Sequence, residues 1–74
     1  MVGILACNKT LNKYGILVHD LWSIKGLNHG DGIYVYLDGD WRKDHIQYDD
    51  QKGEWYLVHS KLRGHKLENI KVRY

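Results

Sequence analysis

The chain has 74 residues, one cysteine, three tryptophans, six tyrosines and a formal net charge of +2. A chain of this length forms one small domain, which we place over residues 1–74. The single Cys7 excludes an intrachain disulfide. No apolar run approaches the roughly 20 residues of a membrane span, and the first residues are too short a run for a signal peptide. We therefore expect a cytoplasmic protein that does not engage a membrane.

The charge is unevenly distributed along the chain. Residues 31–54 carry seven acidic side chains against three basic ones, a net charge of −4. From residue 61 onward, five basic side chains face one acidic side chain, a net charge of +4. A basic segment of this kind attracts acidic partners without identifying them.

The first half of the chain predicts a β-hairpin and a third short segment. Residues 2–7 and 14–18 are apolar and rich in β-branched side chains, and a polar stretch joins them. Cys7 then pairs with Tyr14 across the hairpin. Residues 20–26 fit either an extended segment or one helical turn, and we favour the extended form.

The second half predicts three more strands and a final one. Residues 33–37 alternate, with Ile33, Val35 and Leu37 on one side and tyrosines on the other, and the strand ends at an Asp-Gly turn signal. Further strands are expected at 41–48, 54–58 and 70–74. A three-residue loop at 38–40 would place Leu37 opposite Trp41 in the core, with a bulge near residues 43–45 to re-aim the strand.

These elements predict an all-β fold. Five to six short strands with at most one helical turn indicate a small, SH3-like antiparallel barrel or meander.

Several turn glycines and core aromatics carry a resemblance to a known family. They are Gly30-Asp31 before a strand, Gly39 and Trp41, His45-Ile46-Gln47-Tyr48, and Trp55-Tyr56-Leu57-Val58. In this order they resemble the uncharacterised family DUF5348, over roughly residues 14–74. The resemblance implies a small β domain from bacteria, especially Firmicutes, and their mobile elements. It implies no activity, and this sequence has His45 and Gln47 where the pattern has Arg and Glu.

Catalytic and metal-binding chemistry has little support in the spacing of the residues. Five histidines and Cys7 are the available metal ligands: His19, His29, His45, His59 and His65. His59 and His65 form one possible two-ligand pair, but no second pair lies nearby in the sequence, so we expect no metal and no cofactor. Gly30-Asp31-Gly32 forms a turn with His29 beside it. No nucleophile motif is present, and we expect no enzyme, although His59 or His65 beside basic residues would suit a ribonuclease toxin.

Binding therefore remains as the expected function. We expect a non-enzymatic phage or mobile-element protein that blocks a host machine, most concretely an anti-CRISPR inhibitor that contacts a nucleic-acid-guided nuclease. A nucleic-acid-binding small barrel is the alternative, through the basic C-terminal segment. The chain is expected to be a monomer or a weak homodimer. The predicted partner-binding residues are Trp22, Tyr34, Tyr36, Lys61, Arg63, Lys66, Lys71 and Arg73.

Overall fold

The protein is almost entirely β-structure. A computed structural model describes all 74 residues. The strands are β1 (Val2–Asn8), β2 (Lys13–Val18), β3 (Leu21–Ile24), β4 (Gly32–Leu37), β5 (Asp40–Asp49), β6 (Glu54–Leu57) and β7 (Lys71–Arg73). One short 3-10 helix, η1 (Gly64–Leu67), lies between β6 and β7. The structure has no helix of the length and apolarity needed to cross a bilayer.

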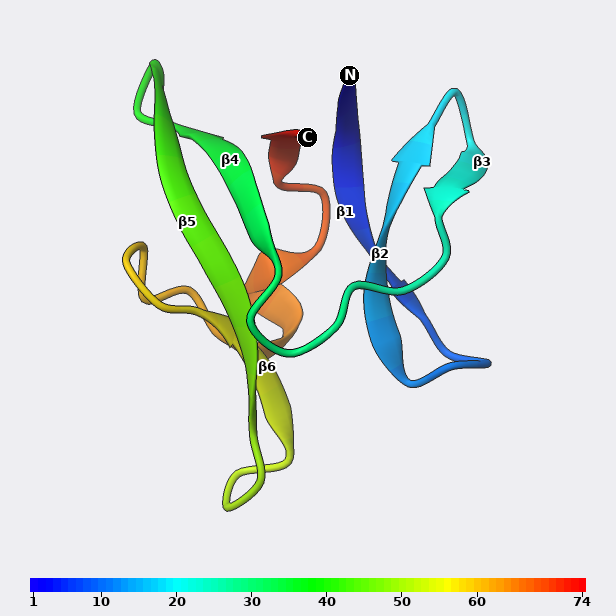
Figure 1. Cartoon of the computed structure of the whole chain (residues 1–74), viewed down its shortest axis with the longest axis vertical. Coiled ribbons are helices and arrows are strands. Elements are labelled where there is room, and N and C mark those ends of the chain that lie inside the picture. The colour runs from blue at the N-terminus through cyan, green and yellow to red at the C-terminus, as the bar shows by residue number, and fades with distance from the viewer.

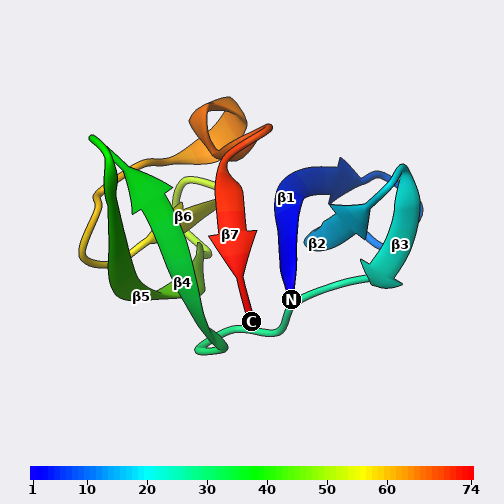
Figure 2. The ribbon, with the colours of Figure 1, turned by 90° about the horizontal axis from the view of Figure 1, so that it is seen from above.

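All seven strands form one antiparallel sheet in the order β3-β2-β1-β7-β4-β5-β6 (Figure 1). The last strand of the chain is therefore central, because β7 pairs with β1 on one side and with β4 on the other. Strand β5 pairs with β4 over its first half and with β6 over its second half. Figure 2 shows β1, β2 and β3 to one side of β7, and β4 and β5 to the other side.

The sheet curls around a single apolar core. Its ten buried residues come from six strands, η1 and the segment before β4: Leu5, Tyr14, Ile16, Leu27, Ile33, Val35, Ile46, Leu57, Leu67 and Val72. The edge strand β6 also contacts the turn between β1 and β2 without pairing with it as a strand. The indole Nε1–H of Trp55, on β6, donates to the carbonyl of Asn12 in the turn before β2 at 3.1 Å. Burial of the apolar side chains is the main source of stability for a domain of this size.

Most of the predicted strands are confirmed, and their number is one higher than the predicted maximum. Residues 21–24 form a strand, as favoured for that ambiguous segment, and Cys7 pairs with Tyr14 as expected. In β4, Ile33 and Val35 are buried whereas the intervening Tyr34 is exposed. The one helical turn, η1, lies at residues 64–67 and not at residues 20–26, where a turn was the alternative to an extended segment.

The predicted pairing of β4 with β5 is wrong by one residue. Leu37 pairs with Asp40, so the turn has only the two central residues Asp38 and Gly39. Both have positive φ values, 53° and 77°, as a type I′ hairpin turn requires. Trp41 therefore lies opposite Tyr36 on the outer face and not opposite Leu37 in the core. The expected bulge near residues 43–45 is absent, because Asp44 and Ile46 already point inward.

Candidate functional site

One face of the β4–β5–β7 part of the sheet gathers aromatic and basic side chains. Residues directly opposite on neighbouring strands share a face, and alternate residues along a strand do so too. Tyr34 lies opposite Lys43 on β5 and opposite Arg73 on β7, and Tyr36 lies opposite Trp41. We call the resulting set the aromatic–basic face: Tyr34, Tyr36, Trp41, Lys43, Lys71 and Arg73.

The side chains of this face contact one another through their rings and cations. The guanidinium carbon of Arg73 lies 5.1 Å from the ring centre of Tyr34 and 4.7 Å from that of Trp41. The Lys71 ammonium lies 5.1 Å from the ring centre of Tyr36, whose ring meets Trp41 edge-to-face. Such contacts hold the cations over the rings. Tyr34 is still 40% exposed, so much of its ring is open to a ligand.

A hollow adjoins the aromatic–basic face. It has a volume of about 320 Å³ and is lined by Tyr34, Lys43, Arg73 and Tyr74 together with Gly32 and Ile33. Two cations and two phenol rings thus border one concave site. Aromatic surface beside positive charge suits a ligand with flat rings and anionic groups.

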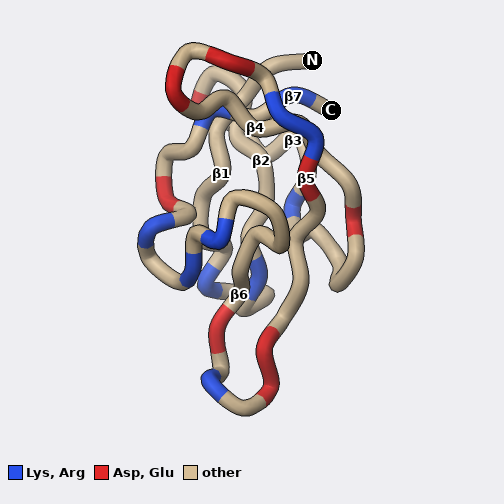
Figure 3. Tube along the Cα trace, turned by 90° about the vertical axis from the view of Figure 1, so that its left-hand side faces the viewer, with Lys and Arg blue, Asp and Glu red and all other residues tan.

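The electrostatic setting of this face is positive. None of its six members is acidic, and three are basic. Figure 3 shows basic positions on β5 and beside the C-terminus, whereas acidic positions gather at the hairpin turns. The net charge of +2 therefore understates the local charge on this part of the surface.

The structure brings together only half of the predicted binding residues. Tyr34, Tyr36, Lys71 and Arg73 lie on the aromatic–basic face. Trp22 lies on β3, the edge strand that β2, β1 and β7 separate from β4. Lys61 lies in the loop after β6 and Lys66 in η1, both exposed and outside this face.

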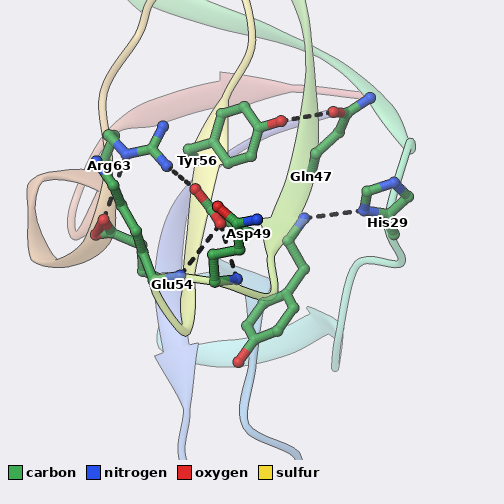
Figure 4. A network of polar contacts seen from close by, with 9 residues as sticks. His29, Gln47, Asp49, Glu54, Tyr56 and Arg63 are labelled. Atoms are coloured by element: carbon green, nitrogen blue, oxygen red, sulfur yellow. Dashed lines mark hydrogen bonds and ion pairs between the residues drawn. The ribbon is translucent and has the colours of Figure 1, made fainter.

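Arg63 lies outside the aromatic–basic face and forms ion pairs with the β5–β6 hairpin (Figure 4). Its guanidinium forms ion pairs with Asp49 and with Glu54, which lie at the two ends of the β5–β6 turn, and it packs 4.5 Å from the ring centre of Tyr56. The pKa of Asp49 lies below its usual value, first because the backbone N–H of Lys52 donates to its carboxylate. Arg63 therefore ties the loop after β6 to this hairpin, and it is less available to a partner than an unpaired arginine.

The turn before β4 has the structural role that the sequence predicted. The Asp31 carboxylate accepts the backbone N–H of Asn28 at 2.8 Å. His29 contributes more than expected, because its Nδ1 accepts the backbone N–H of Tyr48 at 2.9 Å and so ties this turn to β5 (Figure 4).

Asp44 is the one buried acidic side chain, only 1% exposed, and the sequence analysis missed it. Its carboxylate accepts the backbone N–H groups of His45, His59 and Ser60 and the hydroxyl of Ser60. Burial alone would raise the pKa of Asp44, but these hydrogen bonds outweigh burial and hold the pKa below its usual value. Asp44 therefore acts as an anion that fixes the chain after β6.

The histidines and Cys7 lie in several different surroundings. The rings of His45 and His59 pack together, whereas His65 and Cys7 line a separate hollow of about 550 Å³ with Tyr14, Trp55 and Glu68. Burial, followed by Glu68 and Cys7, raises the pKa of Tyr14. No hydrogen bond joins the Cys7 thiol to the His65 imidazole, so the structure does not pair them as nucleophile and base. The expectation that the protein is not an enzyme stays a prediction.

The family resemblance can be compared directly with a family model. The model described as "Domain of unknown function (DUF5348)" matches residues 3–74. No curated protein and no solved structure matches the chain. Because the match spans nearly all of the sequence, the chain belongs to the DUF5348 family.

Proposed function

We propose that this protein is a non-enzymatic binding protein whose aromatic–basic face holds single-stranded nucleic acid. The observation that carries the proposal is the alternation of rings and cations on β4, β5 and β7, with Arg73 set between Tyr34 and Trp41. Unpaired bases stack on aromatic rings irrespective of sequence, and lysine or arginine contacts the phosphates. The hollow beside Tyr34 offers a ring and two cations to a single nucleotide.

The observed register of the β4–β5 hairpin supports nucleic-acid binding more than it supports the blocking of a host protein, which the sequence alone favoured. With the predicted loop, Arg42 and Asp44 would lie opposite Tyr36 and Tyr34 on the outer face of the hairpin. With the observed turn, Trp41 and Lys43 lie opposite Tyr36 and Tyr34. The observed register thus adds a ring and removes an acidic side chain on the same side of the sheet as Arg73.

Binding is tested by fluorescence anisotropy with a labelled oligothymidylate of about 12 nucleotides, within the usual footprint of a small β domain. We expect the affinity to fall as salt rises, with each phosphate contact contributing about 0.7 to the slope of log K against log salt. Tyr34→Ala should weaken binding by about 5- to 150-fold, since stacking on one ring is worth roughly 1–3 kcal/mol. Arg73→Gln should weaken binding and lower the salt slope.

The matched control is Lys52→Gln, which removes a positive charge in the exposed β5–β6 turn, away from the aromatic–basic face. It should change the affinity by no more than about twofold, because dissolved salt screens the attraction between the ligand and exposed charges far from the site. No binding at low salt, or equal losses in Lys52→Gln and Arg73→Gln, would contradict nucleic-acid binding at this face.

A second candidate is the blocking of a host protein machine such as a CRISPR effector, the role expected for a mobile-element protein. The apolar surface next to the aromatic–basic face favours it. A hollow of about 320 Å³ is lined by Val2, Ile4, Leu17 and Val18, with Lys71 at its border. Protein interfaces combine an apolar centre with tyrosine, tryptophan and arginine anchors.

Val2→Gln separates the two candidates. Val2 is 45% exposed, so the change should be tolerated by the fold. A neutral side chain is chosen because Val2 lies opposite Arg73, where a carboxylate would itself repel phosphate. If the protein blocks a nuclease by protein contact, Val2→Gln should raise the concentration needed for half-inhibition of DNA cleavage at least tenfold and leave oligothymidylate binding within twofold. Full cleavage at a large excess of the unchanged protein would contradict the second candidate for the nuclease used.

A further inference from the structure

Two histidines from different parts of the chain meet at the outer edge of the β5–β6 pair. The backbone N–H of Val58 donates to the carbonyl of His45 at 3.1 Å, which places the residues after β6 beside β5. The imidazole rings of His45 and His59 lie with their centres 5.1 Å apart and their planes at 81°. His45 follows Lys43 on the same side of β5, but neither histidine is a member of the aromatic–basic face or lines the hollow that contains Cys7.

A single buried carboxylate fixes the backbone under both rings. Asp44 Oδ1 accepts the backbone N–H of His45 at 2.8 Å and the backbone N–H of His59 at 2.9 Å. Its other oxygen, Oδ2, is held by the N–H and the hydroxyl of Ser60. The positions from which both imidazoles project are therefore set in advance, as a preformed ligand site requires.

The ring nitrogens of this pair are free. Neither imidazole forms a hydrogen bond with the rest of the protein, whereas the His29 ring is already occupied by the N–H of Tyr48. His59 is exposed and His45 is partly exposed, so an ion in solution can reach both.

We propose that His45 and His59 together bind a borderline divalent transition-metal ion such as Zn²⁺ or Ni²⁺. The candidate ligand atoms of Asp44, His45 and His59 all lie within 4.8 Å of one another. Zinc–imidazole bonds are about 2.0–2.1 Å long, so modest ring rotation brings two nitrogens onto one ion. Because each Asp44 oxygen already accepts two hydrogen bonds, Asp44 is a positioning residue here and water completes the coordination.

The test is an isothermal titration of the untagged full chain with ZnCl₂ and, separately, with NiCl₂ at neutral pH, without nucleic acid. We expect one ion per chain. NMR should show shifts, or broadening by Ni²⁺, centred on residues 45 and 59. His45→Gln and His59→Gln should each lower the affinity at least tenfold, because each removes one of two protein ligands.

The matched controls are His19→Gln and His65→Gln, which make the same change at histidines outside the pair. Both should bind the ion as the unchanged protein does. Circular dichroism confirms that each variant is folded, and His59→Gln, at an exposed position, is the variant least able to disturb the core. Absence of binding, or binding that persists in both His45→Gln and His59→Gln, would overturn the proposal. So would equal loss in the controls. Because no nucleic acid is present, the result is independent of the proposed function.

Discussion

Replacement of Asp44 by asparagine is expected to lower the free energy of unfolding by roughly 2–4 kcal/mol, although the side chain keeps its size. An amide presents one acceptor oxygen and one donor nitrogen where the carboxylate presents two acceptors. In either orientation, the amide nitrogen then faces N–H or hydroxyl donors of His45, His59 or Ser60 that are left without an acceptor. Each buried unsatisfied donor costs about 1–3 kcal/mol, and relief from burying a charge returns part of that cost.

Urea unfolding followed by circular dichroism measures this loss. In thermal unfolding the midpoint should fall by about 8–32 °C, given about 4–8 °C per kcal/mol for a domain of this size. Asp50→Asn is the matched control, because Asp50 is exposed in the β5–β6 turn and accepts no hydrogen bond. It should change the free energy of unfolding by no more than about 0.5 kcal/mol. If the two variants were equally stable, Asp44 would not hold the chain after β6.

The free energy of unfolding should also depend on pH through the charge of Asp44. Hydrogen bonding holds the pKa of Asp44 below the usual 3.8, so the folded protein binds a proton here less readily than the unfolded chain. The stabilisation is therefore present above the usual carboxyl pKa and is lost as the pH falls through the lowered, folded-state pKa. The stability gap between the unchanged protein and Asp44→Asn should be widest near neutral pH and shrink in acid. A gap that does not change with pH would show that the charge of Asp44 contributes nothing.

The strands could be predicted from the sequence because their signals are local. In β4, alternation separates Ile33 and Val35 from Tyr34 and Tyr36, and Asp-Gly marks the turn that follows. The position of β7 has no such signal. Three residues long, it lies between β1 and β4 only because long-range contacts fix it there, and those contacts place Lys71 and Arg73 beside two tyrosines.

The residues of the candidate sites could not be predicted because the observed register of β4 with β5 differs by one residue from the predicted register. Strand side chains alternate with a period of two, so one residue of slip exchanges the two faces. The shorter turn at Asp38 and Gly39 moves Trp41 to the outer face and Asp44 to the inner face. Asp44 and Ile46 are two residues apart, so an inward Ile46 already implies an inward Asp44. That relation was the signal available in the sequence, and it became informative only with the correct turn.

Gly15→Ala is expected to be the other strongly destabilising change, by about 3 kcal/mol, at the upper end for overpacking. A Cβ at Gly15 would lie 2.3 Å from the carbonyl oxygen of Ile24 and 2.7 Å from that of Lys25. The ring of Trp22 would be 2.8 Å away. The pairing of β2 with β3 shifts register between Ile16 and Leu17, and near this irregularity the backbone of β3 passes close to Gly15. Backbone atoms cannot move aside as the end of a side chain can, so β3 would have to leave β2.

Gly32→Ala makes the same change in another strand without the crowding. Gly32 lacks a positive φ, and the nearest atom to its added Cβ, the Asp44 carbonyl oxygen, is 3.9 Å away. This variant should be neutral or stabilised by up to about 1 kcal/mol, since alanine restricts the unfolded chain. Urea unfolding of both variants gives the comparison. Equal stability would contradict the close approach of β3 to β2, whereas a lower m-value for Gly15→Ala would show β3 detached while the rest stays folded. In that case oligothymidylate binding should persist, because β2 and β1 separate β3 from β7, the nearest strand of the aromatic–basic face.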